Sequence, residues 1–162
     1  PWIFGRVLAG LNDTEMPDLP SVQDRKDMLL RELEGRLKYL PEDVRLKKLV
    51  GNILLMAQSG QYNYKRCVLR EETAAAQLAV IEFVNATLKV IFLLNRKYIP
   101  YYKWSFRALK ELPKFSEFYY ELEYLISSSN TEKESKLKEE IIEKISSAII
   151  NELKKILKKI II

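Results

Sequence analysis

An almost unbroken apolar stretch over residues 78–94 constrains the fold of this chain more than any other feature. Its seventeen residues are marginal for a membrane span, and Glu82, Asn85 and Lys89 interrupt it. We therefore predict a buried helix of a helical bundle and no association with a membrane. The predicted helix covers residues 72–97, which is about 39 Å at the helical rise of ~1.5 Å per residue.

Apolar residues at helical spacing predict further helices on both sides of this segment. One helix is expected from Ser21 to residue 40, and a second starts at Pro41 and runs through Met56. Gly60 either caps the second helix or marks a kink within it. A short helix ending at Leu112 and another after residue 113 complete the middle of the chain.

The last predicted helix spans residues 132–162 and follows a polar loop at 127–131. Its expected buried stripe consists of Leu137, Ile141, Ile145, Ile149, Leu153, Ile156 and Ile160. The prediction is an all-α bundle of five or six helices in one domain over residues 21–162. Residues 1–20, which contain glycine and proline but little periodicity, are predicted to be a linker or docking arm.

The composition excludes several kinds of catalysis. The chain has no histidine, which rules out Ser-His-Asp and Cys-His mechanisms and zinc sites that need histidine. Its single cysteine, Cys67, suggests a reducing compartment, and we expect a cytoplasmic protein. Without a glycine-rich phosphate loop or an Asp-x-Asp motif, we expect no metal site and no cofactor on this chain alone.

The net charge of +5 is spread almost evenly when it is counted over long segments of the chain. Residues 71–130 carry seven basic and seven acidic side chains, and the segments on either side are only slightly basic. This distribution does not require a nucleic-acid partner. RNA binding without catalysis stays open as a third interpretation, and it would need a clustered basic face that charge counts along the sequence do not show.

Three groups of residues are candidates for chemistry, and the first is the segment Tyr62-Asn63-Tyr64-Lys65-Arg66. On a helix Tyr62 and Arg66 share a face, and aromatic rings beside a guanidinium suit a nucleotide or a phosphate. The alternative is an amphipathic helix end whose tyrosine rings cap the core.

The second group is Glu82, Asn85 and Lys89 on the most apolar helix, where their spacing places all three on one face. A carboxylate there needs a partner or a wet cleft, since burying it unpaired is costly. An internal polar network, with Asn52 or Arg45 as partner, is the simpler interpretation. In a cleft, Glu82 could act as a general base or position a hydroxyl group.

The third group is the aromatic and basic segment at residues 98–107. Lys103 and Arg107 are one helical turn apart and could share a phosphate, and Trp104 lies between them. The alternative is an aromatic corner that closes the end of the bundle.

Several motifs resemble the helical half of a bacterial family of unknown function: PEDVRLKKL at 41–49, MAQSGQYNYKRC at 56–67, ETAAAQLAV at 72–80, FLLNRKY at 92–98 and YYKWSFR at 101–107. In that family a nucleotidyltransferase-like domain precedes an all-α domain similar to HEPN domains and to the substrate domain of kanamycin nucleotidyltransferase. The resemblance implies that Mg²⁺ and a nucleoside triphosphate are held by a partner domain, in cis or in trans. The transferase motifs are missing here, so we expect a fragment, a stand-alone partner or an engineered chain. The ribonuclease activity of HEPN domains is not supported, because it needs a histidine.

The resemblance also implies roles for individual residues. Lys103 or Arg66 would neutralise phosphate charge, Trp104 and Tyr64 would stack, and Glu82 would orient or deprotonate the acceptor. The competing interpretation is a non-enzymatic interaction module that binds a partner helix or forms a homodimer through the apolar stripe of the last helix.

Overall fold

The computed structural model describes residues 26–27, 29 and 40–161, and the chain divides into two compact units, Pro1–Tyr39 and Leu40–Ile162. In the first unit, Lys26, Asp27 and Leu29 are helical. The expected linker at residues 1–20 and most of the helix expected at 21–40 lie outside the described residues.

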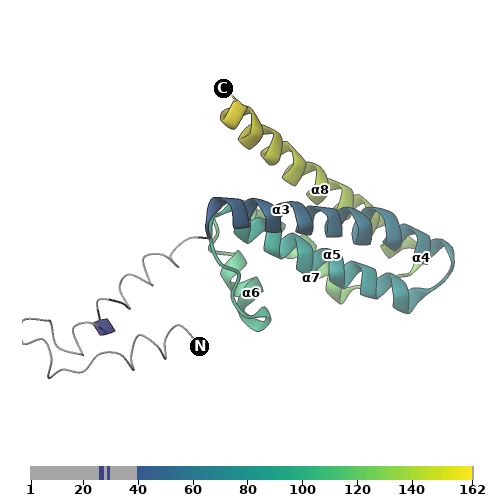
Figure 1. Ribbon diagram of the computed structural model, residues 1–162. Helices are drawn as coiled ribbons and strands as arrows, with labels where there is room; N and C mark the ends of the chain where they lie inside the picture. The colour runs from purple at the N-terminus through teal and green to yellow at the C-terminus, as the bar shows by residue number, and fades with distance from the viewer. Residues whose placement is uncertain (1–25, 28, 30–39, 162) are drawn as a thin grey trace, which may run out of the picture. The chain divides into compact units, whose positions relative to one another are not determined.

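The second unit is built from helices, and its described residues contain no strand (Figure 1). This confirms the all-α class. The elements are α3 (Glu42–Met56), the π-helix η1 (Ala57–Tyr64), α4 (Lys65–Leu69), α5 (Thr73–Leu94), α6 (Tyr102–Leu109), the 3-10 helix η2 (Ser116–Phe118), α7 (Tyr119–Ser127) and α8 (Glu132–Ile161).

The framework of the unit is a helical hairpin in which α3, η1 and α4 run one after another along α5. The chain reverses after α4, where Glu71 has a positive φ of 58° and the amide of Glu72 donates to the carbonyl of Cys67. Gly60 is neither a cap nor a break, because the helix continues through it as π-helix. A Cβ at Gly60 would lie 2.3 Å from Cδ2 of Phe83, so the glycine lets η1 approach α5 closely.

Helix α5 is the core of the unit, as the apolar stretch predicts. By length and composition it is the one helix among the described residues that could cross a membrane, but 67% of its most apolar window is buried inside the bundle. From Ala86 to Leu94 every residue except Lys89 is buried. Burial of this kind is expected of the central helix of a bundle.

An ion cluster joins the start of α3 to the end of α5. Arg45 is buried, and its guanidinium donates to both carboxylate oxygens of Glu42 at 2.9 and 2.6 Å and to the carbonyl of Leu93 at 3.2 Å. Arg96 donates to the same carboxylate at 3.0 Å. The hydrogen bond from Arg45, with the charges of both arginines, lowers the pKa of Glu42 to about 2.

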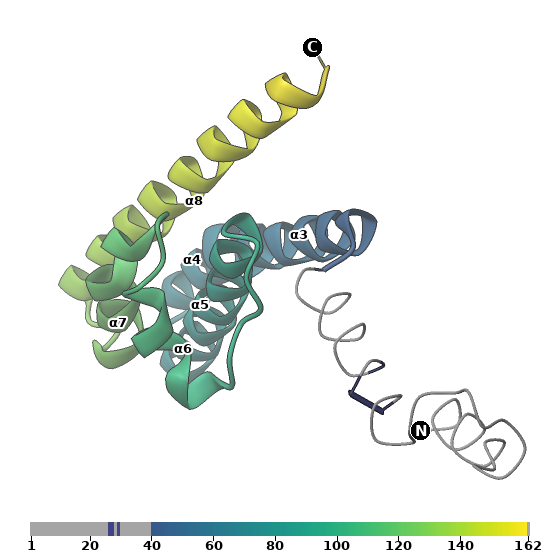
Figure 2. The ribbon, with the colours of Figure 1, turned by 90° about the vertical axis from the view of Figure 1, so that its left-hand side faces the viewer.

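Helix α8 packs on η1 and α7, and its C-terminal half extends beyond the other helices (Figure 2). Its buried face differs from the predicted stripe, since Ile142, Ile145 and Ile149 are buried whereas Leu137 is exposed. In the first turns the inward positions are taken by Ser135 and Lys138. The predicted stripe was therefore wrong at the start of α8, because the inward-facing Lys138 meets polar partners on α5 and on the loop before α8.

Two glycines of the hairpin give a paired test of this packing. Gly60→Ala is expected to lower the free energy of unfolding by about 1–3 kcal/mol, because the buried ring of Phe83 must move. Gly51→Ala, on the exposed side of α3 where a Cβ meets no atom within 4 Å, is expected to raise it by about 0.5–1 kcal/mol. Urea unfolding followed by circular dichroism measures both, and equal effects would contradict the close contact.

The ion cluster of Glu42, Arg45 and Arg96 makes the stability of the fold depend on pH. Because the pKa of Glu42 is lower in the folded chain, its contribution is present above pH 4.5 and is lost as the pH falls towards 2. Glu42→Gln is expected to lower the melting temperature at pH 7 and to flatten its dependence on pH between these values. Asp43→Asn in the same turn is the control, since Asp43 forms no ion pair with another described residue.

Candidate functional site

A groove runs between α3 and α5 and consists of two hollows that share Lys89. The first, of about 330 Å³, is lined by Leu55, Leu78, Ile81, Glu82, Asn85, Ala86 and Lys89. The second, of about 320 Å³, is lined by Leu40, Lys48, Asn52, Lys89, Phe92, Leu93, Lys97, Tyr98 and Ile99. We call the two hollows together the α3–α5 groove.

The predicted stripe of Glu82, Asn85 and Lys89 lines this groove and shares one face of α5. All three side chains are exposed, so they do not form the expected internal network. The two proposed partners are engaged elsewhere: the Asn52 amide donates to the carbonyl of Lys48 at 2.7 Å, and Arg45 binds Glu42. The open surface between helices leaves the Glu82 carboxylate accessible to a ligand.

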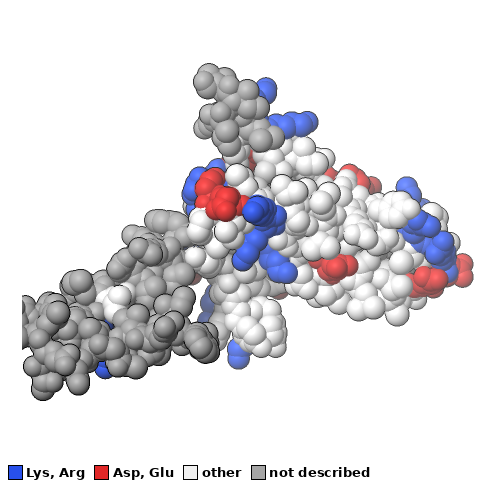
Figure 3. All heavy atoms as spheres, viewed as in Figure 1, with Lys and Arg blue, Asp and Glu red and all other residues white. Residues whose placement is uncertain are grey.

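Three lysines from different parts of the chain surround the second hollow. Lys48 comes from α3, Lys89 from α5 and Lys97 from the segment after α5. Figure 3 shows a group of basic side chains over α3 and α5 within a mainly uncharged surface. None of the three lysines forms an ion pair with a described carboxylate, whereas the floor includes Phe92 and Leu93. Unpaired cations around an apolar floor suit an anionic ligand that has an apolar or aromatic part.

The α6 ring cluster, which we define as Tyr98, Tyr101, Tyr102 and Trp104, follows the groove along the chain. The ring centroids of Tyr101 and Tyr102 are 4.4 Å apart, and those of Tyr101 and Trp104 are 6.2 Å apart. The ammonium of Lys103 lies 5.3 Å from the Trp104 ring. The inward face of α6 is formed instead by Ser105 and Leu109, so the cluster does not plug the bundle.

Tyr62 and Arg66 form an exposed pair on η1 and α4. Figure 1 shows α4 at the end of the hairpin opposite to α6. Arg66 donates to the Tyr62 hydroxyl, and its guanidinium carbon lies 4.8 Å from the ring centroid. The pair lies on η1 and α4, whereas α6 follows the opposite end of α5. The structure therefore does not bring this pair together with the residues of the groove or of α6.

Tyr64 is fully buried, and its hydroxyl donates to Oδ1 of Asn130 at 3.0 Å. Burial raises the pKa of the hydroxyl. A ring in this position is not available to stack on a base, and its role here is to join η1 to the loop before α8.

Lys138 on α8 belongs to the same buried network. Its ammonium donates to Oε1 of Gln77 at 3.1 Å, to the carbonyl of Ser128 at 2.9 Å and to Oδ1 of Asn130 at 3.0 Å. Burial lowers the pKa of Lys138, and these three acceptors are all neutral oxygens. The network links α5, the loop and α8 with Tyr64, which explains why a lysine occupies the inward face of α8.

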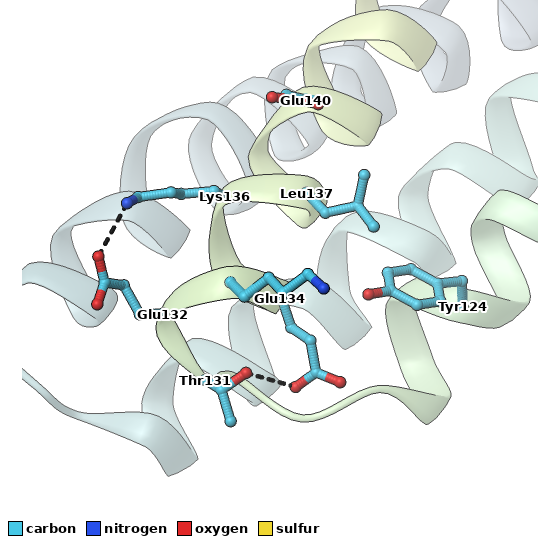
Figure 4. A pocket seen from close by; sticks show the side chains of 8 residues that line it. Tyr124, Thr131, Glu132, Glu134, Lys136, Leu137 and Glu140 are labelled. Carbon is cyan, nitrogen blue, oxygen red and sulfur yellow. Dashed lines mark hydrogen bonds and ion pairs between the residues drawn. The ribbon is translucent and has the colours of Figure 1, made fainter.

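A third hollow, of about 890 Å³, lies where α8 begins and includes Tyr124 of α7 (Figure 4). Three of its charged side chains have partners in the hollow itself: Lys136 donates to Glu132 at 2.8 Å, and Thr131 donates to Glu134 at 2.8 Å. The Thr131 and Glu134 pair is typical of a helix N-terminus. This hollow therefore has a structural explanation and is not our candidate site.

Apart from Tyr64, which is buried, the predicted site residues fall into three places. Glu82 and Asn85 line the groove, Lys103, Trp104 and Arg107 lie on α6, and Tyr62 and Arg66 lie at the far end of the hairpin. Sequence reasoning missed Lys48 and Lys97, because the meeting of α3 with α5 brings them to Lys89. No group of three or more acidic or cysteine side chains placed to hold a metal ion is found among the described residues.

A helical domain with an open, lysine-lined groove is thus the class of protein that the structure defines. The chain belongs to the family described as Domain of unknown function (DUF4037), which matches residues 21–105. The match includes α3, α5 and the groove between them. Neither the curated proteins nor the solved structures contain a significant match to the chain.

The buried network gives a third test. Lys138→Met keeps most of the side-chain volume but leaves the carbonyl of Ser128 without this donor, and we expect a loss of about 1–3 kcal/mol in the free energy of unfolding. Lys133→Met, on the exposed side of the same helix, is the control and should change stability by less than about 0.5 kcal/mol. Equal stability of the two variants, measured by thermal and urea unfolding, would show that the network contributes little.

Proposed function

We propose that this chain is the helical substrate-binding or accessory domain of a nucleotidyltransferase-like protein. The motifs at residues 41–107 support the link to nucleotidyl transfer, and the α3–α5 groove is the observation on which the proposal rests. The catalytic half, which would hold Mg²⁺ and the nucleoside triphosphate, belongs to a partner domain in cis or in trans. The HEPN-like relationship of the bundle is part of the same proposal.

The groove divides its tasks between its two ends. Lys48, Lys89 and Lys97 neutralise phosphate charge at one end, where three cations converge and none of the described lining residues is a carboxylate. Glu82 and Asn85 lie at the other end, about 10 Å and about 6 Å respectively from Lys89 along α5 at the helical rise of ~1.5 Å per residue. There the carboxylate of Glu82 can orient or deprotonate an acceptor hydroxyl while the lysines hold the phosphate.

Positioning of this kind is the main requirement of the chemistry. Transfer of a nucleotidyl group depends on alignment and on neutralising charge, by analogy with phosphoryl transfer. A domain that holds the acceptor beside the triphosphate therefore contributes to the rate even when the metal ligands lie elsewhere. This division would place the reacting atoms at the face between the two domains.

A second candidate function is a non-enzymatic interaction module. The outer side of α3 carries Leu46, Val50 and Leu54 at successive turns, and all three are exposed. Apolar residues repeated on an uncovered face are typical of a surface that binds another chain. Light scattering separates the two functions, because a stable dimer that shows no response to nucleotides favours the module.

Binding of ATP to the whole chain tests the proposed function. Lys89→Glu is expected to weaken ATP binding about tenfold or more, since it reverses the central charge of the three lysines. Isothermal titration calorimetry with ATP and with tripolyphosphate measures the effect. Lys133→Glu, outside the groove, is the matched control and should leave the affinity within about twofold.

Two outcomes would overturn the proposal. One is that ATP and tripolyphosphate do not bind the wild-type chain in the presence or absence of Mg²⁺. The other is that Lys89→Glu and Lys133→Glu weaken binding equally, which would mean that the anion recognises net charge and not the groove.

A further inference from the structure

The basic side chains in the middle of the chain are segregated from the acidic ones. Between Glu82 and Glu111 the sequence has no acidic residue and six basic ones: Lys89, Arg96, Lys97, Lys103, Arg107 and Lys110. The even count over residues 71–130 conceals this, because the acidic residues lie before and after the segment. The fold places these cations on the end of α5, the following loop and α6.

Two of the six cations are engaged by residues outside the α6 ring cluster. Arg96 is paired with Glu42, and the Lys110 ammonium lies 4.0 Å from the centroid of the Tyr119 ring. The other four are exposed and form no ion pair with a described carboxylate. They are Lys89, Lys97, Lys103 and Arg107.

The α6 ring cluster lies in the middle of these cations and is open to solvent. Tyr98 is 48% exposed, Tyr101 58%, Tyr102 72% and Trp104 51%. By contrast, Phe106 on the other side of α6 packs against Tyr119, with ring centroids 5.8 Å apart. Four exposed rings within seven residues are therefore not needed to hold α6 in place, and their faces are available to a ligand.

We propose that the α6 ring cluster and the neighbouring cations bind a single-stranded nucleic acid, whose bases stack on the rings and whose phosphates lie on the lysines. Every base offers a flat face to an aromatic ring, and a continuous run of cations without carboxylates complements a polyphosphate backbone. The inference builds on the proposed function, because it names the acceptor as a nucleic-acid strand.

Charge and geometry together select this ligand. Tyr98 belongs both to the ring cluster and to the lining of the groove, beside Lys97. A strand bound on α6 can therefore continue past Lys97 and Lys89, and its end can reach Glu82. A duplex is a poorer ligand, because its base faces are stacked inside the helix and cannot reach the rings. An acidic protein would match the cations but would not need four open ring faces.

Fluorescence anisotropy with a fluorescein-labelled oligouridine of about 12 nucleotides tests the inference on the whole chain. We expect binding that weakens with salt, with a slope of log K against log salt near −2 to −3 for about four phosphates. A duplex of the same length should bind at least about tenfold more weakly.

Variants separate stacking from charge. Trp104→Ala is expected to weaken oligouridine binding at least about fivefold and to leave the salt slope unchanged, because it removes a ring and no charge. Lys103→Ala is expected to weaken binding and reduce the slope by about 0.7, as for one phosphate contact. Tyr120→Ala, which removes an exposed ring of α7, and Lys133→Ala are the matched controls and should have no effect.

The outcomes distinguish this inference from the proposed function. If ATP binds through Lys89 but oligouridine does not bind, the nucleic-acid site is wrong and the groove stands. If oligouridine binds through Trp104 but ATP does not bind, the ring site stands and the proposed role of the groove fails. Equal binding of duplex and single strand would overturn the inference. So would a Trp104→Ala variant that binds oligouridine normally but has a lower mass by light scattering, because the rings would then belong to a protein contact.

Discussion

The burial of α5 against the helical rod formed by α3, η1 and α4 is the interaction on which the rest of the structure depends. Contacts at two points along the hairpin fix how closely the two segments pack. Gly60 lets η1 approach Phe83 along the hairpin, and at its end the buried Arg45 connects Glu42 with the carbonyl of Leu93. Because α5 has more apolar surface than α3 alone can cover, α6 and α7 also pack against it. The positions of the groove and of the ring cluster both follow from this hairpin.

The groove exists because α5 is not apolar on every side. Glu82, Asn85 and Lys89 lie on one face of an otherwise buried helix, and no helix covers that face among the described residues. The apolar residues beside the three form the floor, and Lys48 of α3 supplies the facing cation. An apolar floor surrounded by unpaired cations suits a ligand that has both an apolar part and negative charge. This match is the physical basis of the binding role that we propose.

Much of the fold could be predicted from the sequence, but less of the site. The periodicity of residues 78–94 predicted the core helix, and the spacing of Glu82, Asn85 and Lys89 correctly placed them on one face. The same reasoning favoured an internal network over an open cleft for those three side chains, and it left open whether Tyr64 binds a ligand or caps the core. Whether one face of a helix meets solvent or a neighbour depends on packing between segments far apart in the chain. Periodicity along one helix contains no information on this point.

By itself the sequence determined that the chain is helical, that its central helix is apolar, and that catalysis by histidine is excluded. These conclusions depend on local spacing and on residue types, which need no knowledge of neighbours. Only the tertiary structure decided that Lys138 is buried among neutral oxygens, that Lys48 and Lys97 join Lys89, and that the rings of α6 face outward. The physical reason is that burial and convergence depend on which faces of different helices meet.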